Sequence, residues 1–266
     1  MELQLLGAVE AWVEGRRLDL GPRQQRLVLA VLALKVNQFV PVERLVDLTW
    51  PESPPHSARH AIHVRVSLLR TVLTLAGAGR DGVEIHTRGP LYVLRADPMC
   101  VDAHRFRALL SDARNATDDV AKASLLRRAL DMWHGPPLAD VVTPPIEALC
   151  QGLEEARLTA LEEWFGAQLR LGRHEAVIDE LAEFVIQHPY RQRLLAQLML
   201  ALYRAGRAPD ALVAYRLTRR RLVDELGLDP SAQLQKLERA ILRGDPALDL
   251  PEPPVGPVGD DDHPPA

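Results

Sequence analysis

Apolar residues recur at helical spacing between Pro54 and Leu75, and this stretch gives the clearest structural prediction in the chain. Spacings of four, three and four residues predict one apolar stripe, which consists of Ile62, Val66, Leu69 and Leu73. Ser57 is a candidate N-cap, so we expect a helix from about Ala58 to Leu75.

The opposite side of this helix carries a mixed set of side chains, namely His60, Val64, Ser67, Leu68 and Thr71. Arg59, Arg65 and Arg70 flank the stripe. Two short strands are predicted next, at Val83–His86 and Tyr92–Leu94, and Thr87-Arg88-Gly89-Pro90 joins them. A helix that is flanked by cations and followed by a hairpin with arginine at its tip is typical of DNA binding. We expect the helix to enter the major groove, and the hairpin, or wing, to reach the minor groove or the backbone.

The residues before this helix predict a small antiparallel sheet and two more helices. The expected strands are Leu3–Leu6, Ala11–Val13 and Arg17–Leu20, with turns at Gly7 and Glu14-Gly15. Gly21-Pro22 opens a helix that ends near Leu34, and a shorter helix covers Val42–Leu48. The predicted order is therefore sheet, three helices and wing, which is an α+β winged helix.

The second half of the chain is predicted to be all-α. Helices are expected over Ser124–Trp133 and Glu147–Leu171. The pairs Gly172-Arg173 and Gly206-Arg207 lie 34 residues apart in similar surroundings, which is the tetratricopeptide period. Helix pairs of this kind stack into a concave protein-binding surface, although chance similarity between helices rich in Ala, Leu and Arg is the rival explanation.

Composition indicates a soluble globular protein, with 47% apolar and 26% charged residues and a net charge of −4. No apolar run is long enough to cross a membrane, and the N-terminus lacks a signal-peptide pattern, so a cytoplasmic location is expected. Residues 54–95 contain six Arg but only two acidic residues, so this segment has a net positive charge. Such a charge is a modest indication of a polyanionic partner, and the alternative is that it belongs to ordinary protein surface.

Several candidate sites have simpler explanations. His56, His60 and His63 lack a completing ligand, so no metal site is expected, and Cys100 and Cys150 are interpreted as reduced, buried thiols. No phosphate-binding loop, nucleophile elbow or metalloprotease helix occurs, so we expect neither catalysis nor a cofactor. Residues without an assigned chemical role are His104, His174, His188 and Arg219-Arg220-Arg221, the last being a solvated face or a second phosphate contact.

The first 96 residues resemble the winged-helix domain of OmpR-type regulators, and more closely that of the SARP family of antibiotic-pathway activators. The strings that carry the resemblance are Leu5-Leu6-Gly7, Arg23-Gln24-Gln25-Arg26, Val42-Glu43-Arg44-Leu45-Val46-Asp47, Trp50, Val64 to Arg70, and Thr87 to Leu94. Two positions depart from the family pattern. Leu68 replaces a usual basic residue, and Leu91 replaces a glycine before the wing tyrosine. Val64 and Leu68 then form an apolar pair that suits thymine methyl groups.

The second half resembles the bacterial transcriptional activation domain of the same family. The matching strings are Val101 to Phe106, Trp133 to Asp140, His188 to Arg191, Gln197 to Arg207, Ala211-Leu212, Tyr215, and Asp224 to Pro230. We therefore expect a winged-helix DNA-binding domain at 1–96, a helical activation domain at 97–244 and a disordered tail rich in Pro and Asp at 245–266.

The resemblance implies a transcription activator of a secondary-metabolite gene cluster. It would bind direct repeats near the −35 region as adjacent protomers, and would contact RNA polymerase and its sigma factor. The expected base-reading residues are His60, His63, Val64, Arg65, Ser67 and Leu68. The expected phosphate contacts are Arg23, Arg26, Arg59 and Arg70, and Arg88 is expected in the minor groove.

Two other classes of function stay open. The chain is alternatively a repressor or architectural DNA binder whose helical domain serves only dimerisation. It is otherwise a helical-repeat scaffold that binds a protein or small ligand, and only the departures at Leu68 and Leu91 support that interpretation.

Overall fold

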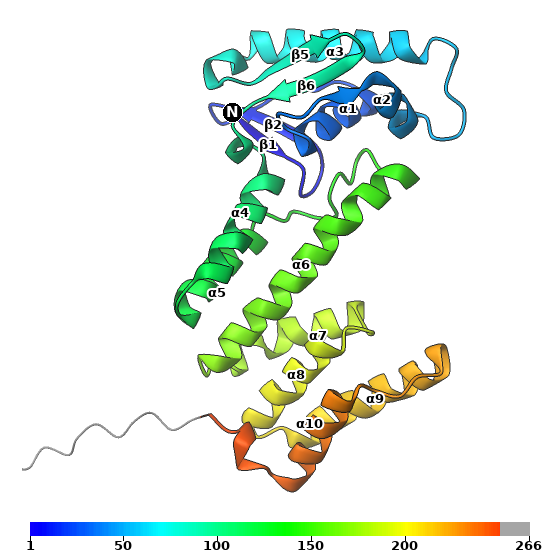
Figure 1. The fold of residues 1–266 in the computed structure, drawn as a ribbon. Helices are drawn as coiled ribbons and strands as arrows, with labels where there is room; N and C mark the ends of the chain where they lie inside the picture. Colours follow the sequence, from blue (N-terminus) through cyan, green and yellow to red (C-terminus); the bar gives the residue numbers. More distant parts are fainter. Residues whose placement is uncertain (251–266) are drawn as a thin grey trace, which may run out of the picture. The chain divides into compact units, whose positions relative to one another are not determined.

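The computed structural model describes residues 1–250, which fall into two compact units. The first unit is Met1–Trp164 and the second begins at Phe165. The first unit contains the winged helix and the beginning of the helical region, and Figure 1 shows the order of the elements. No helix in the described part of the chain is long and apolar enough to cross a membrane.

The chain begins with a three-stranded antiparallel sheet in the order β1-β2-β3. The strands are β1 (Glu2–Gln4), β2 (Glu10–Val13) and β3 (Arg16–Arg17). β1 and β3 are shorter than the sequence predicted, and β2 begins one residue earlier. Glu14 and Gly15 join β2 to β3, with φ angles of 48° and 75°. Positive φ at both central residues is the type I′ turn that matches the twist of a hairpin, so the expected turn is confirmed.

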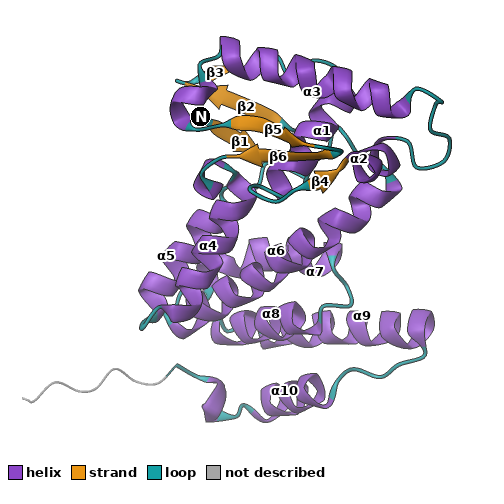
Figure 2. Cartoon of the chain, turned by 45° about the horizontal axis from the view of Figure 1, so that its top comes forward, coloured by secondary structure: helices purple, strands orange, loops and turns teal. Residues whose placement is uncertain are grey.

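Three helices and a second sheet complete the winged helix. The helices are α1 (Arg23–Leu34), α2 (Val42–Thr49) and α3 (Ala58–Leu75). The sheet has the order β4-β6-β5 and consists of β4 (Val40–Pro41), β5 (Glu84–Arg88) and β6 (Leu91–Arg95). Strand β5 contacts α3, and Figure 2 shows the strands of this sheet in orange. A short 3₁₀ helix, η1 (Ala78–Asp81), links α3 to the hairpin.

Helix α3 has the bounds that its apolar stripe predicted. Ile62, Val66, Leu69 and Leu73 are all buried against the winged-helix core. The predicted N-cap bond is absent, because Ser57 precedes the helix without a side-chain hydrogen bond to its first turn. Burial of the stripe therefore positions the helix, and capping by Ser57 does not.

The first unit continues with a 3₁₀ turn, η2 (Pro98–Cys100), and with helices α4 (Asp102–Asn115) and α5 (Asp119–Leu130). Helix α5 begins five residues earlier than Ser124, the expected start, because Asp118 caps it by accepting from the Ala121 N–H at 2.8 Å. Helix α6 (Pro144–Arg170) also begins before its expected start, with proline in its first turn.

The second unit contains helices α7 (Ile178–Gln187), α8 (Gln192–Arg204), α9 (Ala208–Leu226) and α10 (Ala232–Arg243), with 3₁₀ turns η3 (Glu175–Val177) and η4 (Pro246–Leu248). The sequence echo has a structural basis. Gly172 and Gly206 both have φ of 74°, and the following arginine of each pair donates its backbone N–H five residues back, to Gln168 and Leu202. The two glycines thus end α6 and α8 with the same left-handed cap.

The first residues of the segment that was expected to be disordered form the 3₁₀ turn η4. Leu248 accepts a hydrogen bond at 2.8 Å from Nε of Arg204, which holds η4 against α8. Residues 251–266, which carry most of the predicted tail, lie outside the described residues.

Candidate nucleic-acid interface

The exposed face of α3 carries five side chains, His60, Val64, Ser67, Leu68 and Thr71. Two of them are apolar, and Val64 and Leu68 are 40% and 48% exposed. Because the opposite stripe is buried, the orientation of this face is fixed by the core. The face offers two hydroxyls, an imidazole and two apolar side chains, which can contact the donors, acceptors and methyl groups on base edges.

The wing-facing flank of α3 is held to the hairpin by hydrogen bonds. Arg70 donates from Nε to the Ile85 carbonyl at 2.9 Å and from Nη2 to Thr87 Oγ1 at 2.6 Å. His63 Nδ1 is hydrogen-bonded to the Tyr92 hydroxyl, and burial raises the pKa of that phenol while the nearby Arg70 lowers it. Arg70 and His63 therefore fix the angle between helix and wing as well as lying near the exposed face.

Arg65 lies on the other flank of α3, away from its predicted position among the base-reading residues. It is half-buried, and Nη2 donates to Gln24 Oε1 of α1. Its Nε atom is buried with no hydrogen-bond partner among the described residues. A guanidinium held against α1 in this way is a contact between helices, and only a rearrangement would bring it to a base edge.

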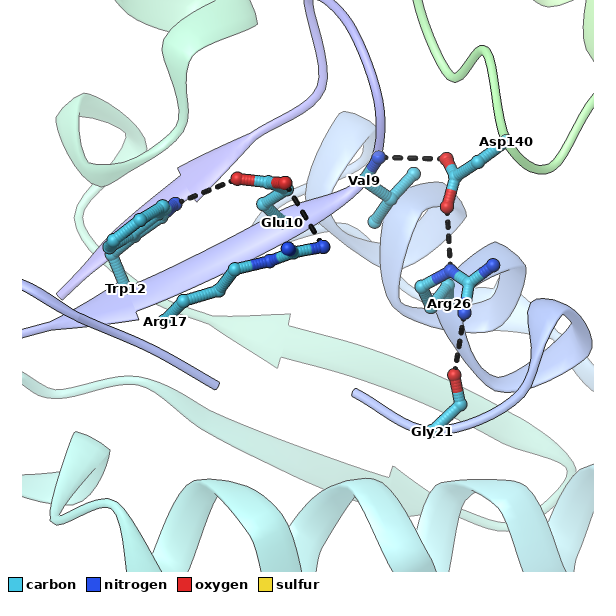
Figure 3. Close-up of polar contacts among 7 residues, drawn as sticks. All are labelled: Val9, Glu10, Trp12, Arg17, Gly21, Arg26 and Asp140. Carbon is cyan, nitrogen blue, oxygen red and sulfur yellow. Dashed lines mark hydrogen bonds and ion pairs between the residues drawn. The ribbon is translucent and has the colours of Figure 1, made fainter. Parts of the chain in front are cut away.

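Arg26 and Arg23 lie against the segment that precedes α6, and Figure 3 shows the contacts of Arg26. Arg26 Nε donates to Asp140 Oδ2 at 2.6 Å, and Nη1 donates to the Gly21 carbonyl at 2.7 Å. The second Asp140 oxygen accepts from the Val9 N–H at 2.8 Å. Arg23 donates to the Val142 carbonyl. The structure thus places Arg26 in a partly buried ion pair, whereas Arg23 stays exposed, and the phosphate contact predicted for Arg23 stays a prediction.

The two remaining predicted cations are exposed. Arg59 pairs with Glu43 of α2 at 2.9 Å, and both side chains are largely exposed, so this is a weak surface pair that a phosphate can replace. Arg88 is exposed at the end of β5, and Gly89 follows it with φ of 58°. The left-handed glycine closes the turn at the wing tip and leaves the Arg88 side chain on the surface.

Three residues that bind predicted site residues were not themselves predicted to belong to the site, namely Gln24, Tyr92 and Asp140. In the sequence, all three stand out only as parts of the strings that match the family. Asp140 lies 114 residues from Arg26, and no local pattern indicates that pairing.

The remaining candidate groups have ordinary surroundings. The described residues contain no group of three His, Cys, Asp or Glu side chains that could hold a metal ion. Cys150 is buried, and burial with nearby Glu154 and Glu147 raises its thiol pKa to about 11, whereas Cys100 is only partly buried. Arg219 and Arg221 pair with Asp229 and Glu225 at 3.6 and 3.2 Å, which favours a solvated face.

The fold and this surface define a class. A small sheet, three helices and a hairpin beside an exposed helix face are a winged-helix domain, and capped helix pairs follow it, which is the architecture of a winged-helix transcription regulator. Residues 101–242 match the family described as "Bacterial transcriptional activator domain". The chain belongs to the SARP family of transcriptional regulators.

Proteins of different lengths are similar in sequence to this chain. The chain is 38% identical over 264 residues to regulatory protein DnrI of Streptomyces peucetius, covering 96% of this chain and 97% of that protein. It is 40% identical to regulatory protein AfsR of Streptomyces coelicolor, covering 92% of this chain but only 24% of AfsR.

A solved structure of Mycobacterium tuberculosis EmbR, in complex with a low-affinity phosphopeptide, has a TM-score of 0.86 at 35% identity. The match covers 91% of this chain and 65% of the EmbR chain, so it supports the fold over nearly the whole sequence. AfsR and EmbR both extend well beyond the shared part.

Proposed function

We propose that the protein is a sequence-specific DNA-binding transcription activator of a secondary-metabolite gene cluster. The observation that carries this proposal is the exposed face of α3, which stands beside a hairpin with a free arginine at its tip. In the proposed complex α3 enters the major groove, and His60, Val64, Ser67 and Leu68 face base edges. His63 lies at the edge of that set, because its ring already binds Tyr92.

The wing and the flanking cations supply the contacts that do not read sequence. Arg88 enters the neighbouring minor groove, and Arg59 exchanges its carboxylate partner for a phosphate. Arg70 reaches a phosphate with the N–H groups that Ile85 and Thr87 leave free. Arg23 is exposed and has further N–H groups for a phosphate beside the one that Val142 accepts. Arg26 and Arg65 are not part of this proposed set, because Asp140 and Gln24 hold their guanidinium groups.

Family resemblance supplies the finer proposal. Two protomers bind direct repeats overlapping the −35 region, side by side, and the helical domain contacts RNA polymerase and its sigma factor. The test is affinity sequencing of genome fragments with the purified full chain at two salt concentrations, because phosphate contacts are salt-sensitive. Enrichment of paired repeats about one helical turn apart, upstream of a biosynthetic cluster, is expected.

Weak binding to all fragments that vanishes at the higher salt would contradict the proposal. Transcription in vitro on an enriched promoter then separates activation from repression. An activator increases the yield of transcript with purified polymerase, whereas a repressor or architectural binder lowers it or leaves it unchanged.

A further inference from the structure

A hollow of about 340 Å³ lies in the first unit, and no residue of α3, β5 or β6 lines it. The end of α1, strand β4, helix α2 and the first turns of α6 surround it. It is lined by Val31, Leu34, Lys35, Gln38, Phe39, Val40, Pro41, Arg44, Leu48 and Leu149. Its volume falls within the range of about 300–1,000 Å³ that small-molecule sites occupy.

The interior of this hollow is apolar and partly open to solvent. Phe39 is 40% exposed, and Leu34 and Leu149 are half-buried. The guanidinium of Arg95 lies 5.7 Å from the centre of the Phe39 ring, so a cation covers one side of that ring. Burying the exposed surfaces of Leu34, Phe39 and Leu149 against an apolar ligand would be favourable by about 25 cal/mol per Å² of area removed from water.

The charges that line the hollow have one sign. Lys35 and Arg44 are exposed, and neither forms an ion pair within the part of the chain that the structure describes. No acidic residue lines the hollow. Arg59 of α3 differs from them, since it pairs with Glu43 of the preceding helix, α2. An apolar floor with two cations lacking carboxylate partners is complementary to an apolar molecule with one anionic group.

We propose that this hollow binds a small organic acid, whose carboxylate lies between Lys35 and Arg44 and whose apolar body packs on Leu34, Phe39 and Leu149. Leu149 belongs to α6, whereas the other four residues belong to the winged helix. A bound acid therefore contacts both parts of the first unit, and stabilises their packing by mass action.

The experiment uses three probes with the same ten-carbon chain, below their micelle concentrations: decanoate, 1-decanol and decylammonium. Isothermal titration calorimetry with the purified full chain should show saturable one-site binding of decanoate, at least tenfold tighter than 1-decanol, and no saturable binding of decylammonium. The temperature of unfolding should rise with decanoate alone. A ring-bearing acid, 1-naphthaleneacetate, tests whether the apolar body can be aromatic.

Variants locate the site. The double variant Lys35→Ala/Arg44→Ala should weaken decanoate binding at least tenfold and bring it to the level of 1-decanol. The matched control Arg107→Ala/Arg114→Ala removes two exposed arginines from α4 and should leave binding unchanged. If the first variant fails to fold by circular dichroism, Lys35→Arg/Arg44→Lys should retain the acid preference, and Leu149→Trp, which fills the hollow, should remove binding. Equal affinity for acid and alcohol, failure of both acids to saturate, or loss in the α4 control would overturn the proposal.

Discussion

Arg26 and Asp140 lie 114 residues apart in the sequence, and their side chains meet at 2.6 Å. The same carboxylate accepts the Val9 N–H, so one side chain joins the N-terminal sheet, helix α1 and the segment before α6. Asp102 makes a second connection: its carboxylate accepts the backbone N–H groups of Leu5 and Leu6 at 2.9 and 3.0 Å. The winged helix is therefore built partly from residues that follow it.

Asp140→Ala should destabilise the first unit. It removes the partner of a partly buried guanidinium and leaves the Val9 N–H without its acceptor, which together cost about 1–3 kcal/mol. Urea unfolding should show the loss. The control is Asp131→Ala, which breaks an exposed pair with Arg127 one helical turn away and should change the free energy of unfolding by less than about 0.5 kcal/mol. Equal effects of the two substitutions would contradict the linking role of Asp140.

Arg88→Ala should weaken DNA binding about tenfold at moderate salt, because it removes the one arginine at the wing tip, and a contact of this type contributes about 1–3 kcal/mol. Fluorescence anisotropy with an enriched promoter fragment measures the change. The slope of affinity against salt should also become shallower. Arg107→Ala lies on α4 and removes the same charge, so it should leave binding unaltered; wild-type affinity in Arg88→Ala would remove the wing from the interface.

Leu68→Arg should shift the preferred site toward guanine, because a guanidinium on the exposed face of α3 can contact guanine O6 and N7 together. Selection from a random DNA library measures the preference base by base. Leu68→Ala removes the apolar side chain without adding a donor, and should weaken preference for thymine without creating one for guanine. An unchanged selected site in both variants would show that this position does not contact bases.

Cys150 should be nearly inert toward thiol reagents in the folded protein. Its pKa is raised to about 11 by burial, so at pH 8 its thiolate fraction is about a hundredfold below that of a thiol with pKa 9. Because the folded pKa is the higher one, the folded state loses stability as pH rises from about 9 through 11. In a Cys100→Ala background, Ellman's reagent should react slowly before unfolding in urea and rapidly afterwards; fast reaction of the folded protein would contradict the buried position.

Gly206→Ala should destabilise the second unit by about 1 kcal/mol. The cost comes from the left-handed backbone at φ of 74°, since a Cβ there would meet no atom within 4 Å. Gly152→Ala is the control, and we expect it not to lower the free energy of unfolding. Gly152 lies within α6 and also has free space, so alanine there should leave stability equal or raise it. Thermal unfolding of both variants tests the difference, and a neutral Gly206→Ala would mean that the cap does not need glycine.

Local patterns predicted the elements of the winged helix better than its contacts. The bounds of α3 follow from an apolar stripe that lies entirely within the helix, so neighbouring residues carry the information. The exposed positions of His60, Val64, Ser67 and Leu68 follow from the same periodicity. The start of α5 was missed because Asp118 caps it from within a polar segment where the apolar periodicity is weak.

The roles of individual arginines could not be predicted in the same way. Arg26 and Arg88 both look like DNA contacts in the sequence, Arg26 to a phosphate and Arg88 in the minor groove, since each is a cation near a helix or hairpin end. The fold alone places Asp140 beside Arg26 and leaves Arg88 exposed to solvent. Arg65 differs from its neighbours for a similar reason: its flank of α3 faces Gln24 of α1, and that distance along the chain is 41 residues.

The bonds from Leu5 and Leu6, just after β1, to Asp102 also affect the order in which the first unit is completed during synthesis. Leu5 precedes Asp102 by 97 residues, and Val9 precedes Asp140 by 131 residues. A ribosome adds about 5–20 residues per second, so Leu5 waits roughly five to twenty seconds for the carboxylate of Asp102, and Val9 waits longer for that of Asp140. The segment between β1 and β2 is made early but is thus among the last parts of the first unit to gain its hydrogen-bond partners. A nascent chain that is stalled near residue 96 contains α3 but lacks Asp102 and Asp140.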